Sequence, residues 1–287
     1  MQYNYKCRLD PPEALIETLL YYVDTCRQLY NHILYKLNES DEIPARYKVQ
    51  GTLPDLKSWW DDLGDAHSKV LQMVAKRVYD NLSTLKAQKE NGHAVGMLKW
   101  KPPRECRSLS YNQSDFKLKN TGGRPVLWLS KIGGIPIHLH RDIPENATIK
   151  QVTVKQEPTG EWFAIFGIDT DEDTPKKPEN PVRCVGIDVG ILKYVRDTDD
   201  SAVESPDLSA EREQLERAQR NLSRKEHGSA NWEQQRQVVA KRHTDLKRNQ
   251  RDFLHKLSNY YATEYDLLAV EDLNAKGLVE AAQQLTQ

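Results

Sequence analysis

The sequence lacks the features of membrane and secreted proteins. No apolar run approaches the roughly 20 residues that a helix needs to cross a bilayer, and the mean hydropathy is −0.75. The N-terminal residues Met-Gln-Tyr-Asn-Tyr-Lys contain no apolar signal-peptide core. We therefore expect a soluble, cytoplasmic protein without a membrane partner.

Paired cysteines and an excess of one charge are missing as well. Cys7, Cys26, Cys106 and Cys184 never form a Cys-x-x-Cys pair, which favours buried free thiols over a zinc site or a disulfide framework. The net charge is −1, from 41 basic and 42 acidic residues. The total charge therefore does not by itself predict a protein that binds nucleic acid.

The charge is nevertheless segregated along the chain. Acids outnumber bases from Asp10 to Asp65, whereas the stretch from Lys99 to Arg124 is basic and contains only Glu105 and Asp115 as acids. A near-neutral total is thus compatible with a basic surface.

The first part of the chain reads as a strand followed by helices. Residues 1–9 alternate in polarity, and Asp10-Pro-Pro-Glu13 predicts the capped start of a helix. A break at residues 51–54 precedes a second long helix, expected from about residue 66 to 89. The predicted apolar faces of the two long helices consist of Leu15, Leu19, Tyr22, Cys26, Leu29, Ile33 and Leu37, and of Val70, Val74, Val78, Leu82 and Leu85.

Short alternating runs follow residue 92 and predict strands. They cover residues 108–112, 116–118, 126–129, 134–140, 149–154 and 162–166. We expect an antiparallel barrel or sandwich over residues 1–168, with a helical insertion at about residues 10–92. Prolines and mixed charges over residues 169–181 are typical of a linker, which leaves residues 182–287 as a second domain.

The second domain contains two predicted helices, over about residues 208–225 and 231–265. Phe253, Leu257 and Tyr260 supply the expected buried face. Both helices are rich in arginine and lysine, and the break between them contains serines and a glycine. Such a break can bind phosphate, although a basic helix face is more often only solvated.

Two acids each follow a short apolar run that predicts a buried strand. Asp188 ends Val-Gly-Ile-Asp, between Gly186 and Gly190, and Glu271 follows Leu-Leu-Ala-Val. Glycines there let the backbone approach a neighbour or a ligand closely. Carboxylates at strand ends can hold the divalent cations of RNase H-like nucleases. Alone, either acid would also suit a solvated turn or an ATPase strand.

Several motifs, in this order along the chain, resemble the TnpB/OrfB family, the accessory "transposases" of small insertion sequences and relatives of the type V CRISPR effectors. The motifs are Arg27-Gln-Leu-Tyr-Asn31, Leu98-Lys-Trp-Lys-Pro102, Ser110-Tyr-Asn-Gln-Ser114, Leu129-Ser-Lys-Ile-Gly133, Gly186-Ile-Asp-Val-Gly190, Gln219-Arg-Asn-Leu-Ser-Arg-Lys225, Arg251-Asp-Phe-Leu-His-Lys-Leu-Ser258 and Val270-Glu-Asp-Leu-Asn274.

The resemblance implies an RNA-guided DNA endonuclease with an α+β architecture. An N-terminal β-barrel wedge domain with a helical recognition insertion would precede an incomplete RNase H-like (RuvC) α/β domain. The implied partners are guide RNA from the 3′ end of the element and a double-stranded DNA target. Asp188 and Glu271 would be catalytic ligands of Mg²⁺ or Mn²⁺. The expected nucleic-acid contacts are Lys99, Lys101, Arg104, Lys117, Lys119, Arg220, Arg224, Lys225, Lys241, Arg242, Arg248 and Arg251, with Trp59, Trp100 or Tyr111 stacking on bases.

The sequence departs from the family after Glu271. The zinc ribbon of the family, with its two Cys-x-x-Cys pairs, and its third catalytic Asp have no counterpart before Gln287. We expect impaired cleavage as a result. A nuclease-inactive, RNA-guided DNA-binding regulator and a decayed fragment remain the alternatives. A strand-transfer transposase is disfavoured, because nothing resembles its His-hydrophobe-His and Tyr arrangement.

Overall fold

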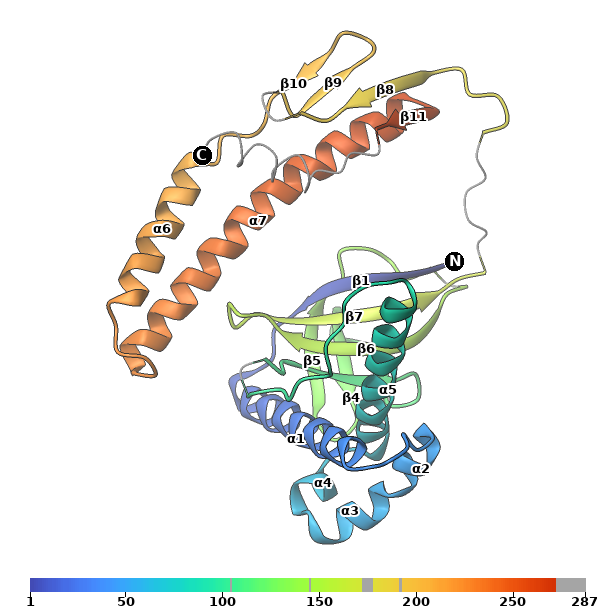
Figure 1. Cartoon of the computed structure of the whole chain (residues 1–287), viewed down its shortest axis with the longest axis vertical. Coiled ribbons are helices and arrows are strands. Elements are labelled where there is room, and N and C mark those ends of the chain that lie inside the picture. The colour runs from blue at the N-terminus through green and yellow to red at the C-terminus, as the bar shows by residue number, and fades with distance from the viewer. Residues whose placement is uncertain (104, 145, 172–177, 191–192, 272–287) are drawn as a thin grey trace. The chain divides into compact units, whose positions relative to one another are not determined.

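The computed structural model describes residues 1–271 except 104, 145, 172–177 and 191–192. The chain divides into two compact units, Met1–Thr174 and Pro175–Gln287, which are labelled by element in Figure 1. Within the described ranges, none of the helices combines the length and the apolar character needed to span a bilayer.

A curled, seven-stranded antiparallel sheet forms the centre of the first unit. Its strands are β1 (Gln2–Leu9), β2 (Ser108–Asn112), β3 (Phe116–Thr121), β4 (Arg124–Leu129), β5 (Gly133–His138), β6 (Thr148–Gln156) and β7 (Trp162–Asp169). Their order across the sheet is β2-β6-β7-β1-β5-β4-β3. Every alternating run that predicted a strand forms one of these strands.

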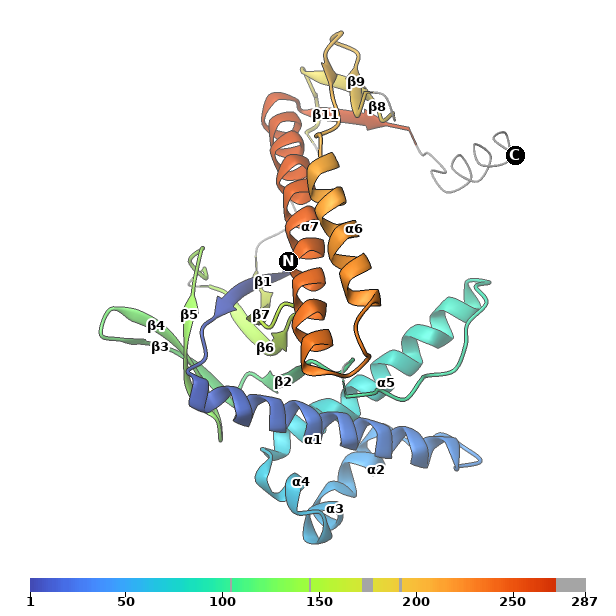
Figure 2. The same ribbon diagram turned by 90° about the vertical axis from the view of Figure 1, so that its left-hand side faces the viewer.

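The first strand of the chain lies in the middle of this sheet. β1 pairs with β7 along its whole length, but with β5 only at Arg8 and Leu9. The short pairing lets β5, β4 and β3 diverge from the other strands, and Figure 2 shows the β3–β4 hairpin extending from the rest of the unit.

Five helices connect β1 to β2. They are α1 (Glu13–Asn38), α2 (Arg46–Gly51), α3 (Leu53–Trp59), α4 (Asp61–Asp65) and α5 (Ser68–Glu90). The predicted cap at Asp10 is wrong, because Pro12 occupies the N-cap and no side chain caps the helix. The Asp10 carboxylate instead accepts hydrogen bonds from Arg8, at 3.2 Å, and from His138.

The two long helices pack on one face of the sheet and form a single apolar core with it. Leu29 of α1 and Val78 of α5 are buried, as their spacing predicted, and meet inward-facing residues such as Leu127 and Phe166 of the strands. Burial of alternate strand residues fixes which face of the sheet meets the helices.

Asn31 ties α1 to the segment that follows α5. Its Oδ1 accepts a hydrogen bond from the backbone N–H of Lys101 at 2.9 Å, and its Nδ2 donates to the Lys101 carbonyl at 3.0 Å. The Lys101 ammonium lies 3.8 Å from the centre of the Tyr30 ring. Two motifs far apart in the sequence, residues 27–31 and 98–102, therefore form one structural contact.

The second unit combines a small sheet with a helical hairpin. Its elements are β8 (Cys184–Asp188), β9 (Val195–Asp197), β10 (Ala202–Val203), α6 (Ser209–Ser223), α7 (Ala230–Glu264) and β11 (Leu267–Val270). The strand order is β10-β9-β8-β11, with β11 parallel to β8.

Helices α6 and α7 lie side by side and antiparallel (Figures 1 and 2). Gln235 of α7 donates to the Ala218 carbonyl of α6 at 3.1 Å, and Asn249 donates to Glu211 at 3.2 Å. The predicted burial of Tyr260 is wrong. Tyr260 is 49% exposed, whereas Tyr261 is 3% exposed and belongs to the small core of the second unit.

We predict that Asn31→Ala lowers the free energy of unfolding of the first unit by about 1–3 kcal/mol, because it leaves the N–H of Lys101 without its partner and leaves the Lys101 carbonyl with only Arg27 as a donor, at 3.4 Å. Urea unfolding followed by tryptophan fluorescence measures the change. Asn38→Ala, at the exposed end of α1, is the matched control. Equal stability losses in the two variants would contradict the role of Asn31.

Candidate functional site

The parallel pair of β8 and β11 brings together the two acids predicted as metal ligands. The paired residues run from Leu267 with Cys184 to Val270 with Ile187. Asp188 ends β8 and Glu271 follows β11, so continuing the register by one residue sets these two acids opposite each other. Neighbouring strands are about 4.8 Å apart, and both carboxylates therefore leave the sheet at the same end.

Both acids are exposed and line one open hollow with a volume of about 460 Å³, together with Gly186, Arg196 and Thr198. In the ranges that the structure describes, no three His, Cys, Asp or Glu side chains are arranged to hold a metal ion. Asp197 also lines the hollow, but its carboxylate accepts hydrogen bonds from Tyr261 and Ser201, so Asp188 and Glu271 are the exposed carboxylates of the described part of the site.

The alternation of β8 explains why the acid faces this hollow. Val185 is buried in the small core of the second unit and Ile187 packs against it. Since neighbouring residues of a strand point to opposite faces, Gly186 and Asp188 face away from that core. The same apolar run thus both anchors the strand and aims its terminal carboxylate outward.

The glycines around Asp188 accommodate close backbone contacts, as the sequence predicted. Gly186 donates its N–H to the Thr198 hydroxyl at 3.1 Å, and a Cβ at Gly186 would lie 2.9 Å from Thr198 Cγ2. A Cβ at Gly190 would lie 2.9 Å from the carbonyl oxygen of Lys193. In both cases the close neighbour is another part of the chain.

Asp266 pins the register of the parallel pair, a role that the sequence did not reveal. Its carboxylate accepts hydrogen bonds from the backbone N–H groups of Arg183 and Val182, each at 3.0 Å. Its own N–H donates to the Arg183 carbonyl at 2.8 Å. The bonds from Arg183 and Val182 lower the pKa of Asp266. These bonds join the starts of β8 and β11, and they therefore fix the positions of Asp188 and Glu271 at the other ends of the two strands.

Asp197 connects the sheet to helix α7. It is buried, and its Oδ2 accepts a hydrogen bond from the Tyr261 hydroxyl at 2.8 Å. Its Oδ1 accepts from the backbone N–H of Ser201 at 2.9 Å. Burial, followed by the bond to Asp197, raises the pKa of Tyr261. Asp197 belongs to the strand Val195-Arg-Asp197, in which one apolar residue precedes two charged ones, so no sequence pattern indicated this role.

The predicted cationic contacts of the first unit differ in their accessibility. Lys99, Lys117 and Lys119 are exposed. Lys101 is half-buried over Tyr30, and burial lowers its pKa. Arg104 lies outside the described residues.

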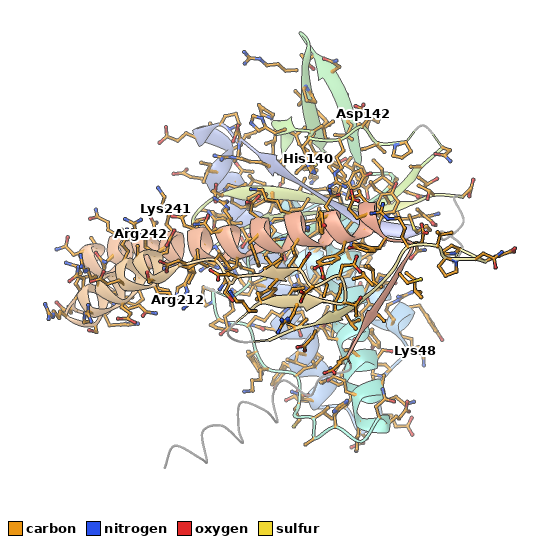
Figure 3. The ribbon with its side chains drawn as sticks, turned by 90° about the horizontal axis from the view of Figure 1, so that it is seen from above. Lys48, His140, Asp142, Arg212, Lys241 and Arg242 are labelled. Carbon is orange, nitrogen blue, oxygen red and sulfur yellow. The ribbon has the colours of Figure 1, made fainter. Side chains whose placement is uncertain are left out.

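The predicted cations of the second unit are exposed on α6, on α7 and in the turn between them. These are Arg220, Arg224, Lys225, Lys241, Arg242, Arg248 and Arg251. Figure 3 labels Lys241 and Arg242 on α7. In the turn, the Ser229 hydroxyl caps α7 by accepting from the Trp232 N–H at 3.1 Å, so this hydroxyl already has a structural use.

The three aromatic residues suggested for base stacking are not equivalent. Tyr111 is buried, and its hydroxyl donates to the Ser130 carbonyl at 3.1 Å, so the suggestion is wrong for this residue. Trp59 and Trp100 are exposed. Trp59, however, lies close in sequence to Asp55, Asp61 and Asp62, which would repel phosphates.

Comparisons with known proteins find similarity to one protein family and to two named relatives. Residues 153–282 match the OrfB_IS605 family, described as "Probable transposase". The chain is 26% identical over 271 residues to "Putative RNA-guided DNA endonuclease InsQ" of Escherichia coli (strain K12), covering 91% of this chain and 63% of that protein. It is 33% identical over 175 residues to "Putative RNA-guided DNA endonuclease" of Streptomyces pristinaespiralis, covering 60% of this chain and 42% of that protein.

The fold is similar to that of a solved nucleoprotein complex. A chain of the "Cryo-EM structure of the Cas12f1-sgRNA-target DNA complex" superposes with a TM-score of 0.58 at 12% identity, over 92% of this chain and 66% of that one. The present chain thus spans less than two thirds of the length of each of these relatives.

We predict that Gly186→Ala destabilises the second unit, because the new methyl group would overlap Thr198 Cγ2. Thr198→Ser removes that methyl group and keeps the hydroxyl that binds the Gly186 N–H, so the double variant should recover most of the loss. Thermal unfolding of the two single variants and the double variant measures the coupling. Additive losses would show that this contact is not the cause.

Asp266 should make the stability of the second unit depend on pH in the acid range. Its pKa is lowered from 3.8 on folding, so its contribution is present above about pH 4 and is lost as the pH falls through the lowered folded pKa. We expect Asp266→Ala to lower the melting temperature at pH 7, with the difference from the parent chain shrinking below about pH 4. Circular dichroism melts measure this difference. Asp200→Asn, on an exposed turn, serves as the control, and a difference for Asp266→Ala that is independent of pH would exclude the carboxylate as its source.

Proposed function

Because the chain belongs to the TnpB/OrfB family, we propose that it acts as an RNA-guided DNA endonuclease whose metal ligands include Asp188 and Glu271. The observation that carries the proposal is the register of β8 and β11, which sets both carboxylates at one end of neighbouring strands. The names of the two bacterial relatives support the activity, and the Cas12f1 complex supports RNA and target DNA as partners.

The proposed layout assigns a task to each unit. Residues 1–168 act as a wedge domain whose helical insertion, at about residues 10–92, recognises the guide and its target. Residues 182–287 act as the RuvC-type nuclease domain. The guide RNA comes from the 3′ end of the element, and base pairing selects the DNA. Exposed cations on β3, α6 and α7 contact phosphates, as the basic surface of a protein that binds nucleic acid requires.

Mg²⁺ or Mn²⁺ fits the donors at the strand ends. Carboxylate oxygens are hard ligands, and Mg²⁺ commonly binds one or two carboxylates while keeping water or substrate phosphate as its other ligands. A bound ion supplies charge stabilisation to the oxygens of a phosphodiester. The contribution of the chain is geometric, since Asp266 and Thr198 fix the strands that present Asp188 and Glu271.

We predict that Asp188→Asn and Glu271→Gln each weaken Mn²⁺ binding by more than about 10-fold, since loss of a residue that only orients a ligand already costs about 10- to 100-fold, and that each abolishes Mg²⁺-dependent cleavage. Electron paramagnetic resonance of Mn²⁺ reads the binding directly. Cleavage is measured on a plasmid target with the chain co-expressed with RNA from the 3′ flank of its gene. Asp200→Asn, which removes an exposed carboxylate paired with Arg196 at 3.6 Å, is the matched control.

The outcomes separate the competing functions. Loss of both readouts in the two site variants, and not in Asp200→Asn, supports the nuclease. Unchanged Mn²⁺ affinity in both site variants refutes the metal assignment. Target binding by the parent chain without any cutting would replace the nuclease with a guided DNA-binding regulator.

A further inference from the structure

Three neighbouring strands of the first unit contain no acid, and two of them, β3 and β4, contain lysine or arginine. From Phe116 to Arg141 the sequence contains neither aspartate nor glutamate. This stretch forms β3, β4 and β5, which lie together at one edge of the sheet. Acidic residues are frequent elsewhere in the chain, 42 among 287 residues, so this edge is a local concentration of positive charge.

The cations and a tryptophan share the outer face of these strands. Leu127 and Leu129 of β4 are buried in the core, so Trp128 between them projects from the opposite face. Lys117 of β3 pairs in register with Trp128, and Lys119 follows on the same face. Within the described part of the chain, neither lysine has an acidic partner. We call Lys117, Lys119 and Trp128 the hairpin face.

The indole of Trp128 is held on the surface and not folded into the core. It is 46% exposed, and it lies against Gly134 of β5, where a Cβ would be 3.1 Å from the ring. The Lys119 ammonium is 4.7 Å from the ring centre. The β3–β4 hairpin itself extends away from the rest of the first unit (Figure 2). A supported, accessible ring beside two cations is the arrangement on which bases stack.

We propose that the hairpin face binds single-stranded RNA, with an unpaired base stacked on Trp128 and with Lys117 and Lys119 on the adjoining phosphates. The choice of RNA rests on the proposed function, in which the guide offers unpaired nucleotides before any DNA duplex is opened. The absence of acids from Phe116 to Arg141 suits a polyanion, and the flat ring suits its bases.

The first test measures binding of a fluorescent uridine 20-mer by anisotropy. We expect Trp128→Ala to weaken binding at least about fivefold and Trp128→Phe to retain most of it, because stacking needs an aromatic ring. Trp59→Ala is the matched control, since this tryptophan is 64% exposed but has acidic neighbours in the sequence. Equal effects of Trp59→Ala and Trp128→Ala would overturn the proposal.

The salt dependence of the same binding tests the two lysines. Lys117→Gln and Lys119→Gln should each reduce the slope of log affinity against log salt by about 0.7, the value for one phosphate contact on a single strand. Lys86→Gln, at an exposed lysine of α5, should leave the slope unchanged. Slopes that do not change for either lysine of the hairpin face would remove them from the interface.

Photocrosslinking of the unaltered chain does not depend on whether Trp128→Ala folds. A uridine 20-mer containing 5-iodouridine should attach to the tryptic peptide Asn120–Lys131, in which Trp128 is the only aromatic residue. Adducts confined to other peptides would overturn the proposal. Competition by a thymidine 20-mer as strong as that by the RNA would overturn the choice of RNA.

These tests are independent of DNA cleavage. Plasmid cleavage without a Trp128 adduct would refute the hairpin face and leave the proposed nuclease intact. An adduct at Trp128 in a chain that neither binds Mn²⁺ nor cuts DNA would support the hairpin face and refute the nuclease.

Discussion

The parallel pairing of β8 with β11 is the interaction on which the candidate site depends. The two strands are separated in the sequence by the α6–α7 hairpin, and only their pairing sets Asp188 beside Glu271. A register shift of one residue would turn the Glu271 side chain to the other face of the sheet. The hydrogen bonds of Asp266 to the residues before β8 oppose such a shift. A carboxylate at one end of the pair therefore determines the geometry of two carboxylates at the other.

The two units are stabilised by different kinds of contact. The first unit buries one continuous core between its sheet and the helices α1 and α5, and apolar burial is the main source of its stability. The core of the second unit contains only Val185, Val195 and Tyr261 as fully buried members among the described residues. Specific polar contacts, such as Tyr261 with Asp197, therefore carry more of its structure. The positions of Asp188 and Glu271 are therefore sensitive to single substitutions elsewhere in the second unit.

Periodicity predicted the positions of the elements well, because apolar spacing and strand alternation are local properties of a sequence. The predicted burial of the run before Glu271 is wrong, because β11 lies at the edge of its sheet and all four of its residues are exposed. Periodicity also indicated that Asp188 and Glu271 end neighbouring strands, since an acid directly after an apolar run is visible without knowing the fold. Their role as metal ligands stays a prediction. The errors share a different cause. The partner of Asp10 is His138, that of Tyr111 is the Ser130 carbonyl, and that of Asp266 is the backbone before β8. Such partners are set by tertiary structure, and no spacing rule along the chain contains them.

Net charge says little about a binding surface, because it averages over surfaces that never meet the same ligand. Trp59 and Trp128 are both exposed, yet the first has Asp55, Asp61 and Asp62 near it in sequence, and the second lies among Lys117, Lys119 and an acid-free stretch. At physiological ionic strength, salt screens charge interactions at a surface over about 8 Å. The Lys119 ammonium, 4.7 Å from the centre of the Trp128 ring, would therefore act on a phosphate bound beside that ring. The proposed binding of nucleic acid therefore rests on where the charges of this chain lie, and a total near zero does not argue against it.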